Sequence, residues 1–107
     1  MTIRVGSDVE KDHILSEYPY TAQVMHPGGT LIVAVEGSSI LGFSWSFTRQ
    51  IPAAVGQREE FINVIEVFDT KHQCKGIGSL IVKKCIEMAK ENECYQVRAY
   101  CHINNTA

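Results

Sequence analysis

The segment from Asp69 to Ser79 has the composition of a site that binds a phosphate group. It reads DTKHQCKGIGS and contains two glycines, Gly76 and Gly78, spaced by one residue. The strand-like run FINVIEVF precedes it, and an amphipathic run follows it. Glycine lets a ligand approach the main chain closely, and the first amides of a helix have no partner inside the helix. The segment therefore predicts that amides at the start of a helix bind a phosphate or pyrophosphate.

Two well-known phosphate motifs do not fit this segment. A P-loop needs GxxxxGK followed by Ser or Thr, which the sequence lacks. The dinucleotide motif GxGxxG needs a third glycine where this chain has Ile81, and it usually follows the first strand of its fold. Lys71 and Lys75 add positive charge nearby, and Ser79 offers a hydroxyl. The expected ligand is therefore a phosphate compound of another class.

The elements that hold this segment follow from hydrophobic periodicity and from turn residues. Strands are expected at residues 2–5, 30–36, 40–49, 61–68 and 95–101, and helices from about Val9 to Tyr18 and from Gly76 to about Glu91. Residues 51–58 are expected to form a loop, and the segment from Thr21 to Gly29 gives no clear signal. The strand, helix and strand at the C-terminal end form a crossover unit, which brings its two strands parallel.

Length and composition bound the class of protein. The 107 residues are 45% hydrophobic and 21% charged, which suits one globular domain over residues 1–107. A net charge of −2 argues against a nucleic-acid surface. The sequence shows neither a signal peptide nor an apolar run long enough for a membrane span, so a cytoplasmic protein is expected. The four cysteines form no CxxC pair, and we expect neither a metal nor a disulfide framework.

The run Gln73-Cys74-Lys75-Gly76-Ile77-Gly78 resembles the signature Q/R-x-x-G-x-G/A of the GNAT superfamily of N-acetyltransferases. The order of the expected elements is also similar to that family. Residues 104–107, Asn-Asn-Thr-Ala, resemble a segment that GNAT proteins often carry after their fifth strand. The resemblance implies an α/β (α+β) fold, a mixed and mostly antiparallel sheet with helices on its faces. It also implies that the last strands of the fold lie beyond Ala107.

The resemblance implies that acetyl-CoA is a cosubstrate. In the family, backbone groups at the end of the preceding strand pair with the pantetheine arm, and the signature loop holds the pyrophosphate. On this chain the implied pantetheine residues are Val67, Phe68 and Asp69. The implied pyrophosphate residues are Gln73, Cys74, Lys75, Gly76, Ile77, Gly78 and Ser79, and Asn104 is implied as a further cofactor contact.

The reaction implied by the resemblance is transfer of an acetyl group to a primary amine by direct attack. Something must then accept a proton from the amine. Glu66 is the candidate base, because it is a carboxylate in an otherwise apolar strand beside the expected thioester. Alternatively, Glu66 lies on a solvated face or pairs with a lysine. Glu59, Glu60 and Asn63 are nearby competitors.

The expected partner is a small-molecule or peptide amine, with no nucleic acid and no membrane. The alternative function is a CoA-binding or regulatory module of the same fold that does not catalyse the transfer. If the final strands are absent, the strand at 95–101 has an exposed edge, and a homodimer is expected through that edge.

Overall fold

The structure, a computed structural model, describes residues 1–51, 56–68 and 76–99. The chain alternates short helices with the strands of one sheet. The described elements are β1 (Thr2–Val5), α1 (Asp8–Glu17), the 3-10 helix η1 (Pro19–Gln23), β2 (Thr30–Glu36), β3 (Ser39–Gln50), β4 (Arg58–Val67), α3 (Ile77–Glu91) and β5 (Gln96–Ala99). No described helix is long and apolar enough to cross a membrane.

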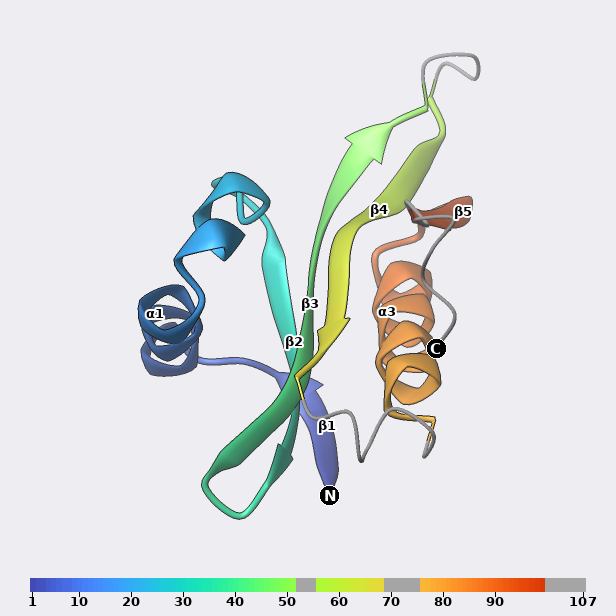
Figure 1. Ribbon diagram of the computed structural model, residues 1–107. Coiled ribbons are helices and arrows are strands. Elements are labelled where there is room, and N and C mark those ends of the chain that lie inside the picture. The colour runs from blue at the N-terminus through green and yellow to red at the C-terminus, as the bar shows by residue number, and fades with distance from the viewer. Residues whose placement is uncertain (52–55, 69–75, 100–107) are drawn as a thin grey trace.

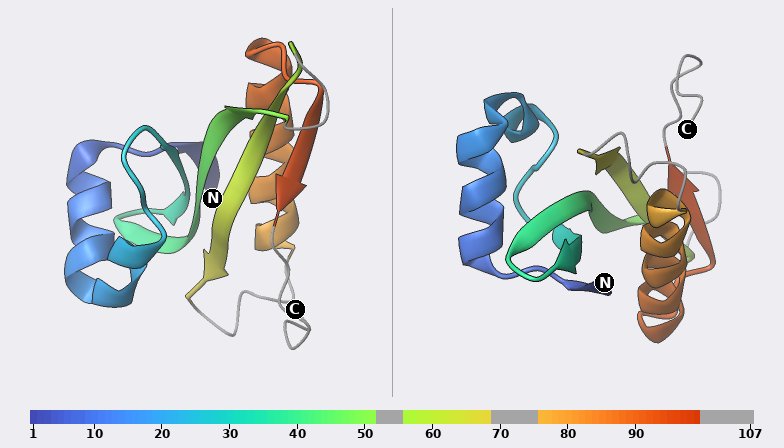
Figure 2. Two further views of the ribbon diagram at one scale, coloured as in Figure 1. Left: turned by 90° about the horizontal axis from the view of Figure 1, so that it is seen from above. Right: turned by 60° about the horizontal axis from the view of Figure 1, so that its bottom comes forward.

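The strands form one sheet in the order β1-β2-β3-β4-β5. The first three pairings are antiparallel, and β4 pairs with β5 in parallel. This confirms both the mixed fold class and the parallel pair that the crossover predicted. Figures 1 and 2 show α1 and η1 on one face of the sheet and α3 on the other. We call these the α1 face and the α3 face.

Each face of the sheet has its own hydrophobic core. On the α1 face, Ile14 packs against strand residues that include Phe43 and Trp45, which are almost completely buried. On the α3 face, Ile77, Ile81 and Cys85 of α3 pack against the sheet. Burial of these apolar side chains fixes both helices against the strands between them.

The predicted loop at residues 51–58 is shorter than expected, and the strand after it is longer. β4 begins at Arg58, whereas the sequence predicted a strand from Phe61. The polar residues Arg58, Glu59 and Glu60 do not resemble a strand in sequence, yet they pair with the end of β3. Side-chain bonds across this hairpin explain the pairing, because Thr48 donates to Glu60 at 2.7 Å and Arg49 donates to Glu59 at 2.6 Å.

The turn and capping residues Gly6-Ser7-Asp8 predict an N-cap before the first helix, and the start of α1 confirms it. The Ser7 side chain accepts a hydrogen bond from the Glu10 amide, and the Glu10 carboxylate accepts one from the Ser7 amide. Arg4 of β1 adds a bidentate pair, with both Nη atoms 2.7 Å from the Glu10 carboxylate oxygens. One carboxylate thus joins the first strand to the first helix.

These bonds predict a pH dependence of stability. Arg4 first, and then Ser7, lower the pKa of Glu10 from 4.5 to about 2. Because the folded-state pKa is lowered, the contribution to stability is present above pH 4.5 and is lost as the pH falls through the folded value. In urea unfolding followed by circular dichroism, Glu10→Gln is expected to be less stable than the wild type at pH 6. The two should converge towards pH 2, and a gap that did not depend on pH would contradict this.

Candidate active site

Within residues 76–99, the N-terminus of α3 presents main-chain amides that have no partner inside the helix. Gly76 is the N-cap residue, with φ 74° and ψ 22°, in the left-handed region that glycine adopts without strain. The first i to i−4 bond in the helix runs from the Leu80 amide to the Gly76 carbonyl at 3.0 Å. The amides of Ile77, Gly78 and Ser79 precede that bond, and the first turn carries no acidic residue. This arrangement suits a pyrophosphate, which accepts hydrogen bonds and favours the positive end of the helix dipole.

Gly78 leaves space at this helix end, whereas other glycines are needed for packing. A Cβ placed on Gly78 would meet nothing within 4 Å among the described residues. By contrast, a Cβ on Gly42 would lie 2.7 Å from the carbonyl oxygen of Glu66. Ile77, between the two signature glycines, is fully buried and anchors the turn in the core. Packing among the described residues therefore does not require a glycine at position 78, and the missing side chain would allow a phosphate to approach the backbone.

The C-terminal end of β4 lies at the same end of the molecule as the N-terminus of α3 (Figure 1). The parallel pairs between β4 and β5 run from Glu59↔Gln96 to Ile62↔Ala99, and β4 continues to Val67. The Phe68 amide donates to the Leu41 carbonyl at 2.9 Å, so this amide is not available to a pantetheine arm.

The structure therefore describes part of the predicted cofactor site. It places Val67 at the end of β4 with Phe68 directly after it, and it places Gly76 to Ser79 at the start of α3. The remaining predicted contacts, Asp69, Gln73, Cys74, Lys75 and Asn104, lie outside the described residues.

A β-bulge in β4 decides which side chains share a face. Trp45 pairs with Val64 and Ser46 pairs with Ile62, so Asn63 is the extra residue. Glu59 and Glu66 are an odd number of residues apart, which would put them on opposite faces of a regular strand. Because the bulge adds one residue between them, both carboxylates lie on the α1 face, opposite Arg49 and Phe43 of β3.

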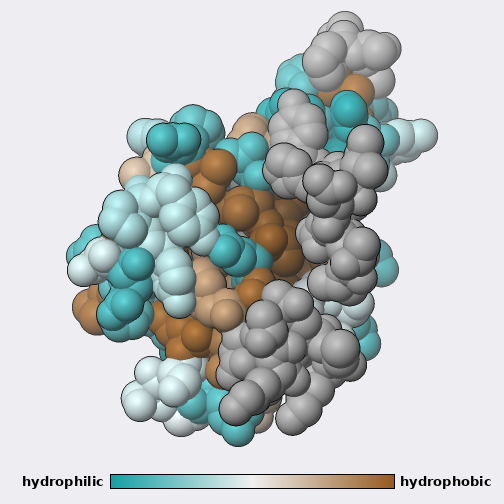
Figure 3. Space-filling view, in the orientation of Figure 1, coloured by the Kyte–Doolittle hydropathy of each residue, from teal (hydrophilic) through white to brown (hydrophobic). Residues whose placement is uncertain are grey.

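Glu66 is a half-buried carboxylate without a basic neighbour among the described residues. The Tyr20 hydroxyl of η1 donates a hydrogen bond to its Oε1 atom. Aromatic rings lie around it: Tyr18 stacks on Phe68 at 4.1 Å between centroids, and Phe68 lies 5.5 Å from Phe43. Figure 3 shows apolar surface in the middle of the face drawn there. The lysine partner considered from the sequence is not found among the described residues, where a neutral tyrosine is the partner.

Glu59 contrasts with Glu66, because its charge is fully compensated. Its side chain is completely buried. It lies 2.6 Å from Arg49 Nε and 3.7 Å from Arg98, and it accepts a hydrogen bond from Gln96 at 2.7 Å. The Gln96 bond, and then the bond and charge of Arg49, hold the pKa of Glu59 below its usual range despite the burial. An ionised carboxylate with these partners is a structural link between β3, β4 and β5 and a poor base.

The other competitors are also engaged elsewhere. Glu60 lies on the α3 face, where it is almost fully buried and accepts the Thr48 hydroxyl. The Asn63 side-chain amide donates to the Val24 carbonyl at 2.7 Å. The sequence offered four polar residues of β4 as bases. Of these, Glu66 is the one that lies on the α1 face and has no described residue compensating its charge.

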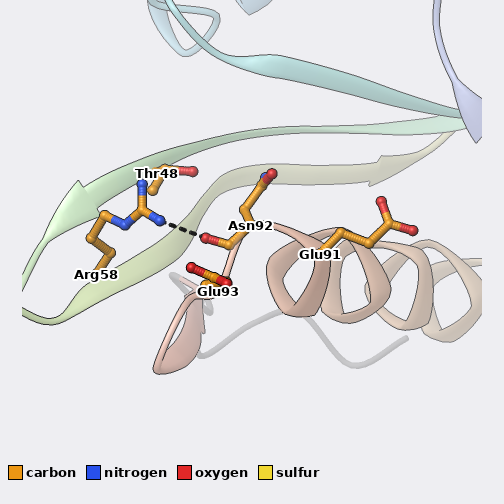
Figure 4. Close-up of a pocket in the computed structure, with 5 residues that line it drawn as sticks. All are labelled: Thr48, Arg58, Glu91, Asn92 and Glu93. Atoms are coloured by element: carbon orange, nitrogen blue, oxygen red, sulfur yellow. Dashed lines mark hydrogen bonds between the residues drawn. The ribbon is translucent and has the colours of Figure 1, made fainter.

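A hollow of about 360 Å³ lies near the opposite end of α3 (Figure 4). Arg58 donates there to the Asn92 carbonyl at 2.8 Å, and Glu91 and Glu93 flank it. The C-terminal end of a helix carries partial negative charge, and two carboxylates add to it. This hollow therefore disfavours a pyrophosphate, and the N-terminus of α3 is the better candidate.

Sequence reasoning missed Tyr20, and it named Asn63 only as a competitor of Glu66, without the bulge. Tyr20 lies in η1, in a stretch without periodicity, and its only signal is its place beside Tyr18 on the other side of Pro19. The bulge has no signal in the sequence that we can identify, because Ile62, Asn63 and Val64 would fit a regular strand.

Three comparisons place this geometry among known proteins. The family model for the acetyltransferase (GNAT) family matches residues 4–107. No curated protein sequence matched the chain. Among solved structures, a ribosomal-protein-alanine N-acetyltransferase from Brucella melitensis biovar Abortus 2308 aligns with a TM-score of 0.77 at 15% identity, over 98% of this chain and 83% of that one.

Two further structures share the fold. An aminoglycoside N-acetyltransferase in complex with CoA aligns with a TM-score of 0.73 at 14% identity, covering 98% of this chain and 82% of that one. A transcriptional regulator from Bacillus halodurans C-125 aligns with a TM-score of 0.76 at 21% identity, covering 97% and 83%. Such identities show a common fold, and the family model covers nearly the whole sequence. The chain therefore belongs to the acetyltransferase (GNAT) family.

Proposed function

We propose that this protein transfers an acetyl group from acetyl-CoA to a primary amine by direct attack. The observation that carries the proposal is the position of Glu66. It is a half-buried carboxylate near the end of β4, at the same end of the molecule as the N-terminus of α3. The N-terminus of α3 would hold the pyrophosphate, and Glu66 would receive the reacting amine.

The proposed residue roles concern two parts of acetyl-CoA, its pyrophosphate and its pantetheine arm. The amides of Ile77, Gly78 and Ser79 would donate hydrogen bonds to the pyrophosphate, and the residues that end β4 would lie along the pantetheine arm. Among the signature-loop residues, Gln73, Cys74 and Lys75 remain predicted contacts, as do Asp69 before the loop and Asn104 after β5. Positioning of this kind lowers the barrier by holding the thioester and the amine in reacting geometry.

Acetyl-CoA supplies an activated acyl group, and the protein supplies proton transfer. The amine nitrogen forms a bond to the thioester carbonyl carbon, the carbon–sulfur bond breaks, and CoA leaves as the thiolate. The amine proton passes to Glu66, directly or through a water molecule. A carboxylate with a basic neighbour, such as Glu59, would serve this step poorly, because the neighbour favours the ionised form.

An amine attracted to Glu66 would arrive as an ammonium ion and would release one proton to bulk water before its nitrogen attacks. The proton that Glu66 accepts is then the second one, which the nitrogen loses as the amide forms. The carboxylate attracts the cation, and the rings of Tyr18, Tyr20 and Phe68 offer faces with which a cation interacts favourably. The solved structures of a ribosomal-protein-alanine N-acetyltransferase and of an aminoglycoside N-acetyltransferase with CoA support a primary amine and a CoA cosubstrate for this chain.

The second candidate is a CoA-binding module that regulates without catalysis, which the fold shared with a transcriptional regulator supports. Two measurements separate the candidates. CoA at a hundredfold over its Kd is expected to stabilise the fold by about 2.7 kcal/mol in a thermal-shift titration. Release of free thiol from acetyl-CoA, followed with a panel of primary amines, then reports transfer. Stabilisation without thiol release would favour the module, and no stabilisation at all would contradict both candidates.

A further inference from the structure

A series of contacts between aromatic rings holds Tyr20 beside Glu66. The Tyr20 ring packs edge-on against Tyr18 at 6.2 Å between centroids. Tyr18 in turn stacks on Phe68, two residues after Glu66. The Tyr20 ring therefore packs, through the ring of Tyr18, against the residue that follows β4, and its hydroxyl donates to Glu66 in the same strand.

Two side chains of the sheet hold the segment that follows Tyr20, one from the bulge in β4 and one from β3. The Asn63 side chain donates to the Val24 carbonyl at 2.7 Å, and the Trp45 indole donates to the His26 carbonyl at 3.0 Å. Thr21, next to Tyr20, is completely buried, and its hydroxyl donates to the Tyr18 carbonyl at 2.7 Å. Although the Tyr20 side chain is about half exposed, its backbone has a defined position.

The protonation state of the pair sets the direction of the hydrogen bond. Burial, and then the bond to Glu66, raise the pKa of Tyr20 to about 12. The phenol therefore keeps its proton at working pH and must donate, while the carboxylate accepts. Other titratable groups near this cluster are Tyr18, His13 and Glu17, and the lysine of α1, Lys11, lies 4.9 Å from the ring centroid of Trp45.

We propose that Tyr20 is a positioning residue for Glu66, which fixes one carboxylate oxygen and turns the other towards the acceptor amine. This inference rests on the proposed transfer to an amine and adds a residue to it. A carboxylate that is free to rotate presents its basic oxygen to the amine for only part of the time. A single donor at Oε1 removes that rotation and leaves Oε2 as the proton acceptor.

The test compares Tyr20→Phe with the wild type in two measurements. Phenylalanine keeps the ring that packs on Tyr18 and removes only the hydroxyl. The variant is expected to lower kcat for the amine about tenfold, with KM for acetyl-CoA unchanged. Tyr95→Phe is the matched control, because Tyr95 is exposed and lies just before β5. A Tyr20→Phe enzyme with an unchanged kcat would overturn the inference.

The second measurement does not depend on activity. With 13C-labelled glutamate side chains, the carboxyl carbon signal of Glu66 is assigned by its loss in Glu66→Gln. In Tyr20→Phe this signal should shift at neutral pH, because the carboxylate loses the hydrogen bond that it accepts at Oε1. An unmoved signal would overturn the inference even if the wild type transfers acetyl groups. If the wild type transferred to no amine, the proposed function would fail, and this signal would still decide whether Tyr20 acts on Glu66.

Discussion

Glu66→Gln is expected to lower kcat/KM for acetyl transfer by about 10²–10⁴-fold, the usual contribution of a general base. Glutamine has nearly the same shape and can still accept the Tyr20 hydroxyl through its carbonyl oxygen. It cannot take a proton from the attacking amine at neutral pH. The loss should therefore appear in the chemical step, and the affinity for CoA, measured by calorimetry, should stay within about twofold of the wild type, because the pyrophosphate site is built from other residues.

Glu36→Gln is the matched control for this substitution. Glu36 is an exposed carboxylate at the end of β2, paired with Ser39, so its loss should change neither activity nor stability by a measurable amount. If Glu66→Gln kept more than about half of the wild-type rate, the proton would have to pass through another group or water, and the role of Glu66 would be wrong.

The second prediction is that Gly78→Ala makes the free protein more stable and its binding of CoA weaker. Gly78 is the second residue of α3, and a Cβ there would meet no atom of residues 1–51, 56–68 or 76–99 within 4 Å. Replacing a helical glycine with alanine usually adds about 0.5–1 kcal/mol to the free energy of unfolding. The same methyl group would stand where a phosphate must approach the amides. Loss of one charge-assisted hydrogen bond lowers CoA affinity by about 10- to 100-fold.

The free energy of unfolding should rise while the CoA affinity falls, so a loss of affinity cannot be explained by a less stable protein. Urea unfolding of the free protein gives the first effect, and calorimetric titration with CoA gives the second. Lys90→Ala, in the last turn of the same helix, controls for a change in helix content and should leave the affinity unchanged. Equal CoA affinities for Gly78→Ala and the wild type would contradict a pyrophosphate site at this helix end.

The elements that depend on local interactions were the easiest to predict. β2 runs from Thr30 to Glu36, as its β-branched and apolar residues indicated. The N-cap of α1 was also predicted, because Gly6-Ser7-Asp8 is a local turn and capping signal. The start of α3 at Gly76 and Ile77 followed from the paired glycines. In each case the deciding interaction lies within a few residues along the chain.

The surroundings of Glu66 were not predictable, because they depend on contacts between distant residues. Its partner Tyr20 is 46 residues away in sequence. Hydrophobic periodicity does not reveal the bulge at Asn63 either. The residues before and after it are apolar, so the segment looks like a regular strand with or without an extra residue. The same applies to Glu59, which the sequence offered only as a competing base. Its partners on β3 and β5 make it a buried structural ion pair instead.

We propose that amides at the start of α3 bind the pyrophosphate of CoA. Titrating the 15N-labelled protein with CoA while recording its amide signals by NMR tests this proposal. We expect the largest shifts at Ile77, Gly78 and Ser79, and little change at Asn92 and Glu93 at the other end of the helix. Largest shifts at Asn92 and Glu93, or saturating CoA without any shift at Ile77 to Ser79, would contradict it.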